Sequence, residues 1–177
     1  MTEESNAQRI HLEPISPERW PAELAVIKGM IPSDLNVYRT MAHDPQLLLA
    51  LAPLRKHIVV DTLLSKRQME FVVLRTARNT GTEYEWAHHV RRGKACGMTD
   101  AEIESVRVSE PIAFEPPVSA LMCAVDELTQ QRAISPETWR SLDRMYGPTH
   151  ILPIIATVGF YTLLAYVINS CGVRLEE

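Results

Sequence analysis

Residues 65–103 read SKRQMEFVVLRTARNTGTEYEWAHHVRRGKACGMTDAEI, and this stretch decides the fold. At three places in it a Ser or Thr is followed three residues later by Gln or Glu: Ser65 and Gln68, Thr82 and Glu85, Thr99 and Glu102. This pattern is the capping box that begins a helix, because each of the two side chains accepts a hydrogen bond from a backbone N–H of the first turn. Gly81 and Gly97 stand where glycine usually ends a helix. The stretch therefore predicts three consecutive helices joined by tight turns.

The rest of the chain also predicts helices. Ser16, Asp44 and Ser135 each precede a proline, which suits the first position of a helix because no N–H partner is needed there. The β-branched runs at residues 57–60 and 71–74 do not alternate with polar residues, so they do not predict strands. We expect helices near residues 17–29, 45–62, 66–79, 83–97, 100–108, 118–131, 136–146 and 149–171.

This reading gives an all-α fold, expected to be an antiparallel helical bundle. Residues 1–44 contain four prolines and are expected to form an N-terminal arm of turns and short helix. Residues 45–177 are expected to form a single domain, with residues 111–117, PIAFEPP, as a connector within it because each proline disfavours helix at the residue before it.

Composition limits the function only broadly. The chain has 177 residues, a formal net charge of −4 and an apolar content of 46%, which fit one globular domain. A slightly acidic chain without a basic tract argues against nucleic acid as a partner. Three widely spaced cysteines form no C-x-x-C pair and no zinc pattern, which favours free thiols in a reducing compartment. Since the first residues also lack the apolar core of a signal peptide, we expect a cytoplasmic protein.

Residues 151–168 carry no charge over 18 residues, a length at which a membrane helix must be considered. Pro153, Thr157 and Gly159 dilute the hydropathy, and no cluster of Lys and Arg flanks the segment. We therefore expect no membrane insertion. A helix that is apolar nearly all round is instead buried, and an interface between subunits of a homo-oligomer is the economical place for it.

The candidate catalytic residues lie on two of the three predicted helices, those near residues 83–97 and 66–79. Glu85 and His89 are four residues apart and Arg92 follows seven residues after Glu85, so these three side chains share one helix face. A carboxylate beside an imidazole orients the ring and raises its basicity, which is typical of an acid–base catalyst. On the preceding helix Glu70 has Val73 and Leu74 as its helical neighbours, so it points toward apolar packing.

Structural roles for the same residues remain open at this stage. For Glu85 the alternative is that its side chain does nothing except cap the helix, as the third residue of its capping box. For Glu70 the alternative is a structural ion pair with Arg67 or Arg75. His88 and His89 point about 100° apart on a helix, so both cannot line one small site. Glu85 and His88 have the Glu-x-x-His spacing of di-iron bundles, but the sequence has no second copy of it, so we expect no metal site.

Residues 63–103 resemble the core of the carboxymuconolactone decarboxylase family, whose superfamily includes the alkyl hydroperoxidase D proteins. The resemblance rests on the apolar helix punctuated by arginines, the Glu-Trp-x-x-His of Glu85, Trp86 and His89, and the start of the next helix. The segment YGPTHILPIIATVGFYTLLAYVINSCGV near the C-terminus is similar to the last helix of that family. Membership implies the alkyl hydroperoxidase D-like bundle, assembled as a trimer or a multiple of trimers.

The resemblance also separates two branches of the superfamily. In the peroxidase branch the motif is Cys-x-x-Cys-x-x-x-His, with a glutamate twelve residues before the first cysteine. Aligned on this sequence, the two cysteines fall on Thr82 and Glu85, the histidine on His89 and the glutamate on Glu70. Both thiols that peroxide reduction requires are therefore missing, while the acid and the base are retained.

The sequence therefore predicts a cofactor-free decarboxylase or lyase acting on a small unsaturated carboxylate or lactone. We expect His89 as acid–base catalyst, oriented by Glu85, with Glu70 as a buried partner. Arg92 is the expected ligand of the substrate carboxylate, with Arg75 and Arg78 as alternatives, and substrate contacts are also expected from Thr82, Trp86 and His88. The alternatives are an alkyl hydroperoxidase-like antioxidant protein and a non-catalytic helical oligomer that binds a small ligand.

Overall fold

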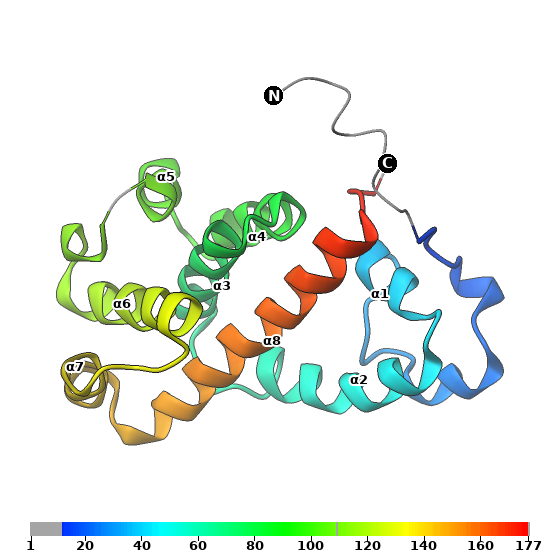
Figure 1. The fold of residues 1–177 in the computed structure, drawn as a ribbon, viewed down its shortest axis with the longest axis horizontal. Coiled ribbons are helices and arrows are strands. Elements are labelled where there is room, and N and C mark those ends of the chain that lie inside the picture. The colour runs from blue at the N-terminus through cyan, green and yellow to red at the C-terminus, as the bar shows by residue number, and fades with distance from the viewer. Residues whose placement is uncertain (1–11, 109, 177) are drawn as a thin grey trace. The chain divides into compact units, whose positions relative to one another are not determined.

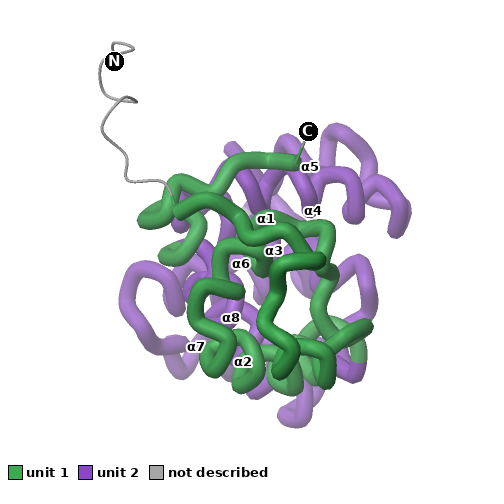
Figure 2. The backbone as a smooth tube through the Cα atoms, turned by 90° about the vertical axis from the view of Figure 1, so that its right-hand side faces the viewer, with its two compact units in different colours: residues 1–60, 166–177 green, residues 61–165 purple. Residues whose placement is uncertain are grey.

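The computed structural model describes residues 12–108 and 110–176. The chain divides into two compact units, residues 1–60 together with 166–177, and residues 61–165 (Figure 2). The expected division into an arm, residues 1–44, and a domain, residues 45–177, stays a prediction.

The first unit consists of short helices joined by turns. It contains the 3-10 helices Pro17–Arg19 and Ala22–Ile27, followed by α1 (Asn36–Met41) and α2 (Pro45–Val59). The continuous helix expected near residues 17–29 is therefore wrong. Trp20 has an extended backbone, with ψ at 139°, because Pro21 disfavours the helical conformation at the residue before it.

The second unit contains the helices that follow. They are α3 (Lys66–Thr80), α4 (Glu83–Ala95), α5 (Asp100–Val108), α6 (Pro116–Gln131), α7 (Pro136–Tyr146) and α8 (Ile151–Cys171), of which residues up to Ala165 belong to this unit. Short 3-10 helices, Pro111–Ala113 and Pro148–His150, precede α6 and α8. No strand occurs among the residues that the structure describes, so the all-α prediction is confirmed.

Two of the three predicted capping boxes form. Ser65 and Gln68 exchange both hydrogen bonds at the start of α3, and Thr99 and Glu102 do so at the start of α5. The box expected between Thr82 and Glu85 is wrong, because the Thr82 side chain makes no capping bond and its hydroxyl instead lies 3.1 Å from that of Thr80.

Helix α3 is the centre of the second unit. It packs between α4 and α6 (Figure 1), and every residue from Met69 to Ala77 is buried. This run includes Arg75, which is 1% exposed and forms two hydrogen bonds to the carboxylate of Asp126 on α6, at 2.7 and 2.6 Å. Arg75 also donates to the carbonyl of Val106, so one buried guanidinium ties three helices together.

Helix α8 carries no charged residue along its whole length, and most of its residues are apolar. Together with the turn before it, Pro148–Cys171, it is long and apolar enough to cross a membrane by length and composition, and half of its most apolar window is buried in the protein. Its exposed positions include Leu152, Ala156, Gly159 and Leu163, which are spaced four, three and four residues apart. Such spacing places them on one face of the helix. Exclusion from the membrane and a cytoplasmic location stay predictions.

We predict that Arg75→Met destabilises the protein by about 3 kcal/mol, because removing one member of a buried ion pair leaves the other charge uncompensated. The matched control is Arg78→Met on the exposed side of the same helix, expected to cost about 0.5 kcal/mol or less. Urea unfolding followed by circular dichroism measures both. Equal losses in the two variants would contradict the role assigned to Arg75.

Candidate active site

The turn between α3 and α4 positions the candidate site. Gly81 has φ at 65°, a left-handed conformation that glycine adopts without steric cost, and its N–H bonds the carbonyls of Ala77 and Arg78. The N–H of Thr82 donates to the same Ala77 carbonyl at 2.9 Å. The chain therefore reverses within two residues and α4 runs back along α3, which brings together side chains far apart in sequence.

His89 lies between two glutamates in this hairpin. Its Nδ1 is 2.6 Å from Oε2 of Glu70 on α3, and its Nε2 is 3.3 Å from Oε2 of Glu85, one turn earlier on α4. All three residues are buried, with exposed fractions of 1% for His89, 7% for Glu70 and 6% for Glu85. The structure thus brings together the three side chains that the sequence predicted as catalytic; their catalytic role stays a prediction.

The surroundings of His89 favour its protonated form. Burial by itself disfavours the imidazolium, but the hydrogen bonds and negative charges of Glu70 and then of Glu85 outweigh that penalty and raise the pKa of His89 above its usual value near 6.5. With both glutamates ionised, Arg92 and a protonated His89 make the cluster neutral, whereas a neutral imidazole leaves one net negative charge in a buried place.

Arg92 completes the cluster on the same helix face. Its Nη1 lies 3.2 Å from Nε2 of His89, and its side chain is half-buried. When Nε2 carries no proton it accepts a hydrogen bond from Arg92; when it is protonated it donates to Glu85. Nε2 therefore has a suitable partner in both protonation states.

One residue that the sequence did not point to also touches the site. Tyr161 of α8 is 5% exposed, and its ring meets the imidazole of His89 edge-on, with centroids 5.1 Å apart. Such aromatic contacts favour one ring orientation. The resemblance of the last helix to the family included Tyr161, but no pattern within the helix separated it from the second tyrosine there, Tyr166.

The three other residues predicted to contact substrate, His88, Trp86 and Thr82, each contact a side chain outside the cluster around His89. His88 is half-buried and its ring lies against Tyr84, with centroids 4.6 Å apart. Trp86 carries the guanidinium of Arg107 over its ring at 4.8 Å, and the Thr82 hydroxyl faces that of Thr80. The structure does not place these side chains on the imidazole of His89, and their role in substrate binding stays a prediction.

The alternative arginines are occupied elsewhere. Arg75 is bound to Asp126, and Arg78 donates to the carbonyl of Arg107 and to the side chain of Asn79. Of the three arginines considered from the sequence, Arg92 is therefore the one that lies at the imidazole. Within residues 12–108 and 110–176, no group of three or more His, Cys, Asp or Glu side chains is arranged to hold a metal ion.

Comparison with known protein families finds one that matches part of the chain. Residues 45–127 match the carboxymuconolactone decarboxylase family. No curated protein matches the sequence.

Solved structures with the same fold share little sequence. The debrominase Bmp8, as an alanine-for-cysteine variant in complex with 2,3,4-tribromopyrrole, is 15% identical with a TM-score of 0.78, over 96% of this chain and 93% of that one. A peroxidase-related protein from Silicibacter sp. TM1040 is 14% identical with a TM-score of 0.77, and the match covers 96% of this chain and 95% of that one. A protein of unknown function from Agrobacterium tumefaciens, suggested to be the antioxidant defence protein AhpD, is 17% identical with a TM-score of 0.69. The match covers 76% of this chain and 94% of that one.

We predict that Glu70→Gln lowers the pKa of His89 by about one unit or more, because the amide keeps the size of the side chain but removes its charge. NMR titration of the histidine ring signals measures this pKa. Glu83→Gln, at an exposed position of α4, the helix that carries His89, is the control and leaves the pKa of His89 unchanged. The same pKa in the wild type and in Glu70→Gln would contradict the charge coupling.

The same shift gives a dependence of stability on pH. Because the pKa of His89 is raised in the folded protein, its contribution to stability is complete below about pH 6.5 and is lost as the pH rises through the folded value. Thermal unfolding should therefore show the wild type losing its advantage over Glu70→Gln as the pH increases across that range.

Proposed function

We propose that this chain, whose residues 45–127 match the carboxymuconolactone decarboxylase family, is a cofactor-free decarboxylase or lyase of that family. Its substrate is a small unsaturated carboxylate or lactone. The reaction uses acid–base chemistry at His89, with Glu70 and Glu85 setting its protonation state.

One observation carries this proposal: the Nε2 atom of His89 has a hydrogen-bond partner both with and without its proton. Arg92 serves the neutral ring and Glu85 the protonated ring, while Nδ1 stays bound to Glu70 at 2.6 Å. A catalyst that gives up and regains a proton needs both states to be stable. A purely structural histidine needs only one.

In the proposed reaction the bond between the substrate carbon and its carboxylate breaks and CO₂ leaves. The electron pair of that bond passes into the conjugated system of the substrate, so no other electron acceptor is required. The imidazolium of His89 then gives the proton on Nε2 to the carbon that receives the electrons, and solvent returns a proton to the ring. Burial of the cluster excludes water from the carbanion-like intermediate.

Arg92 is the proposed ligand of a substrate carboxylate. A guanidinium has five N–H groups in a planar fork, so Arg92 can contact His89 with one of them and still present others to an anion. Because Arg92 is half-buried, it is the member of the cluster best placed to receive a substrate from solvent.

Two of the three cysteines do not favour the thiol peroxidase alternative. Burial and then the negative charge of Glu70 raise the pKa of Cys96, whose Sγ donates to the carbonyl of Gly93 at 3.2 Å. Burial and then the charges of Glu127 and Asp126 raise the pKa of Cys123. Since the thiolate is the nucleophile in peroxide reduction, a raised pKa makes both thiols poor candidates.

We predict that His89→Ala lowers the rate of CO₂ release from carboxymuconolactone about 100-fold or more, the usual scale for loss of a general acid–base catalyst. The circular dichroism spectrum and the mass in solution should not change. His57→Ala, at an exposed position of α2, is the control and retains the wild-type rate. Wild-type turnover in His89→Ala would contradict the role of the imidazole, and the absence of turnover by wild type would contradict carboxymuconolactone as the substrate.

We further propose that the chain forms a homo-oligomer, a trimer or a multiple of trimers. The exposed stripe of Leu152, Ala156, Gly159 and Leu163 on α8 supports this proposal, because spacings of three and four residues are those of a helix–helix seam. Leu152 is 72% exposed, and a Cβ on Gly159 would meet no atom within 4 Å, so the stripe is open to another helix.

We predict that Leu163→Glu lowers the mass in solution toward that of one chain, because the seam would then bury a charge. Size-exclusion chromatography with light scattering measures the mass. The control is Val108→Glu, at an exposed position of α5, which should keep the wild-type mass. The same mass in Leu163→Glu and in wild type would contradict the placement of the seam.

A further inference from the structure

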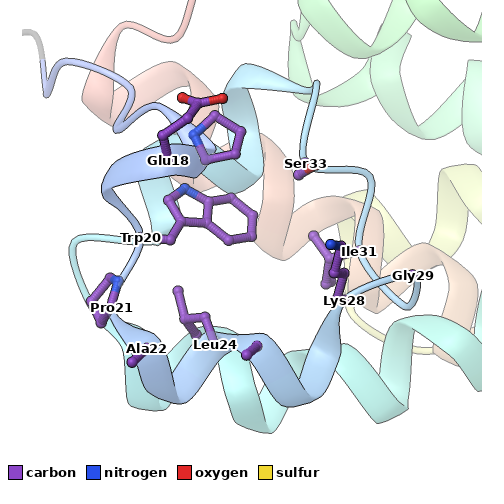
Figure 3. A pocket seen from close by; sticks show the side chains of 11 residues that line it. Glu18, Trp20, Pro21, Ala22, Leu24, Lys28, Gly29, Ile31 and Ser33 are labelled. Atoms are coloured by element: carbon purple, nitrogen blue, oxygen red, sulfur yellow. The ribbon is translucent and has the colours of Figure 1, made fainter.

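The first unit contains a cavity that the chemistry above does not use. It has a volume of about 360 Å³ and lies over the two 3-10 helices and the turn after them. A volume of this size is at the lower end of the range for small-ligand sites. Its lining comprises Pro17, Glu18, Trp20, Pro21, Ala22, Leu24, Ala25, Lys28, Gly29, Ile31 and Ser33 (Figure 3).

One wall of the cavity is a fixed aromatic surface. The indole N–H of Trp20 donates to the carbonyl of Ile15 at 3.0 Å, which holds the ring in one orientation. Leu24 and Ile31, both nearly fully buried, add aliphatic surface. Figure 3 shows Trp20 and Leu24 on one side of the hollow and Ile31 on the other. A flat, apolar group can therefore stack on Trp20 without reorganising it.

The opposite side of the cavity offers a cation. Lys28 lies across from Trp20, next to Ile31 (Figure 3). Among residues 12–108 and 110–176, its ammonium has neither an ion pair nor a side-chain hydrogen bond. An exposed lysine at the edge of an apolar hollow is a suitable ligand for an anionic group at one end of a bound molecule.

The single carboxylate of the lining does not compete with such an anion. Figure 3 shows Glu18 beyond Trp20, on the side away from Leu24. Its backbone N–H and the Ser16 side chain lower its pKa, as does the charge of Arg39 to a smaller extent. The carboxylate of Glu18 is therefore bound by its own backbone and by Ser16, and the positive charge of Arg39 partly compensates its negative charge.

We propose that this cavity binds a small flat aromatic carboxylate, whose ring stacks on Trp20 between Leu24 and Ile31 and whose carboxylate pairs with Lys28. The size of the cavity sets the limit at one or two fused rings. The proposal does not depend on the reaction at His89, since all its residues belong to the first unit.

The probe for this site is 2-naphthoate, with 2-naphthamide as its uncharged counterpart. Isothermal titration calorimetry on the full-length protein should show saturable binding of 2-naphthoate with a Kd of about 1 mM or tighter. Trp20→Ala should weaken it about tenfold by removing the stacking surface. Lys28→Gln should weaken it about threefold to fivefold and leave the binding of 2-naphthamide unchanged.

The matched control for the tryptophan is Trp139→Ala, since Trp139 is a half-exposed tryptophan of α7 in the other unit and its removal should leave the Kd unchanged. Circular dichroism verifies that each variant is folded. If Trp20→Ala does not fold, Lys28→Gln still tests the proposal. The absence of saturable binding would overturn the proposal, as would equal affinities in wild type and Lys28→Gln. Tighter binding after deletion of residues 1–11 would instead make that segment the natural occupant and would also overturn it.

Discussion

The hydrogen bond between Nδ1 of His89 and Glu70 is the interaction on which the site depends. It joins two helices that are consecutive in the chain, at 2.6 Å and out of contact with solvent. Burying a carboxylate is costly unless it is paired, and burying two is more so. Glu70 and Glu85 are tolerated because one imidazolium and one guanidinium neutralise them. The protonation of His89 therefore adds to the stability of the packing, and the proposed reaction uses the same proton.

The same requirement explains a broken local rule at the start of α4. Thr82 and Glu85 have the sequence of a capping box, and the two equivalent pairs in α3 and α5 form one. At α4 the carboxylate instead reaches His89, one turn further along the helix. The helix loses the hydrogen bonds of the box, and the cluster gains its second negative charge. Departures from local preference of this kind are expected where function competes with stability.

Much of the fold follows from local signals, and most of what was not predicted depends on contacts between distant segments. Capping residues, prolines and glycines located α2 to α8. The helix expected near residues 17–29 was wrong because Pro21 disfavours the helical conformation at Trp20. Spacing on one helix predicted that Glu85, His89 and Arg92 share a face, and the apolar neighbours of Glu70 singled it out before the resemblance to a family placed it in the motif. Tyr161, the bond between Arg75 and Asp126, and the cavity beside Trp20 depend on how segments pack, which spacing along one helix does not specify.

The hairpin of α3 and α4 has Thr82 and Glu85 where the motif of the peroxidase branch has its two cysteines, and this difference changes which proton transfer suits the histidine. A histidine that activates a thiol must be neutral, because it has to accept the thiol proton. Here the position aligned with the second thiol carries Glu85, whose charge adds to that of Glu70 and favours the imidazolium. A ring that already holds its proton cannot accept another, so it is available as a proton donor, although its raised pKa makes it a weaker acid than a free imidazolium. A geometry that suits a base beside a thiol is therefore compatible, in this chain, with the proton-donating role that we propose for His89.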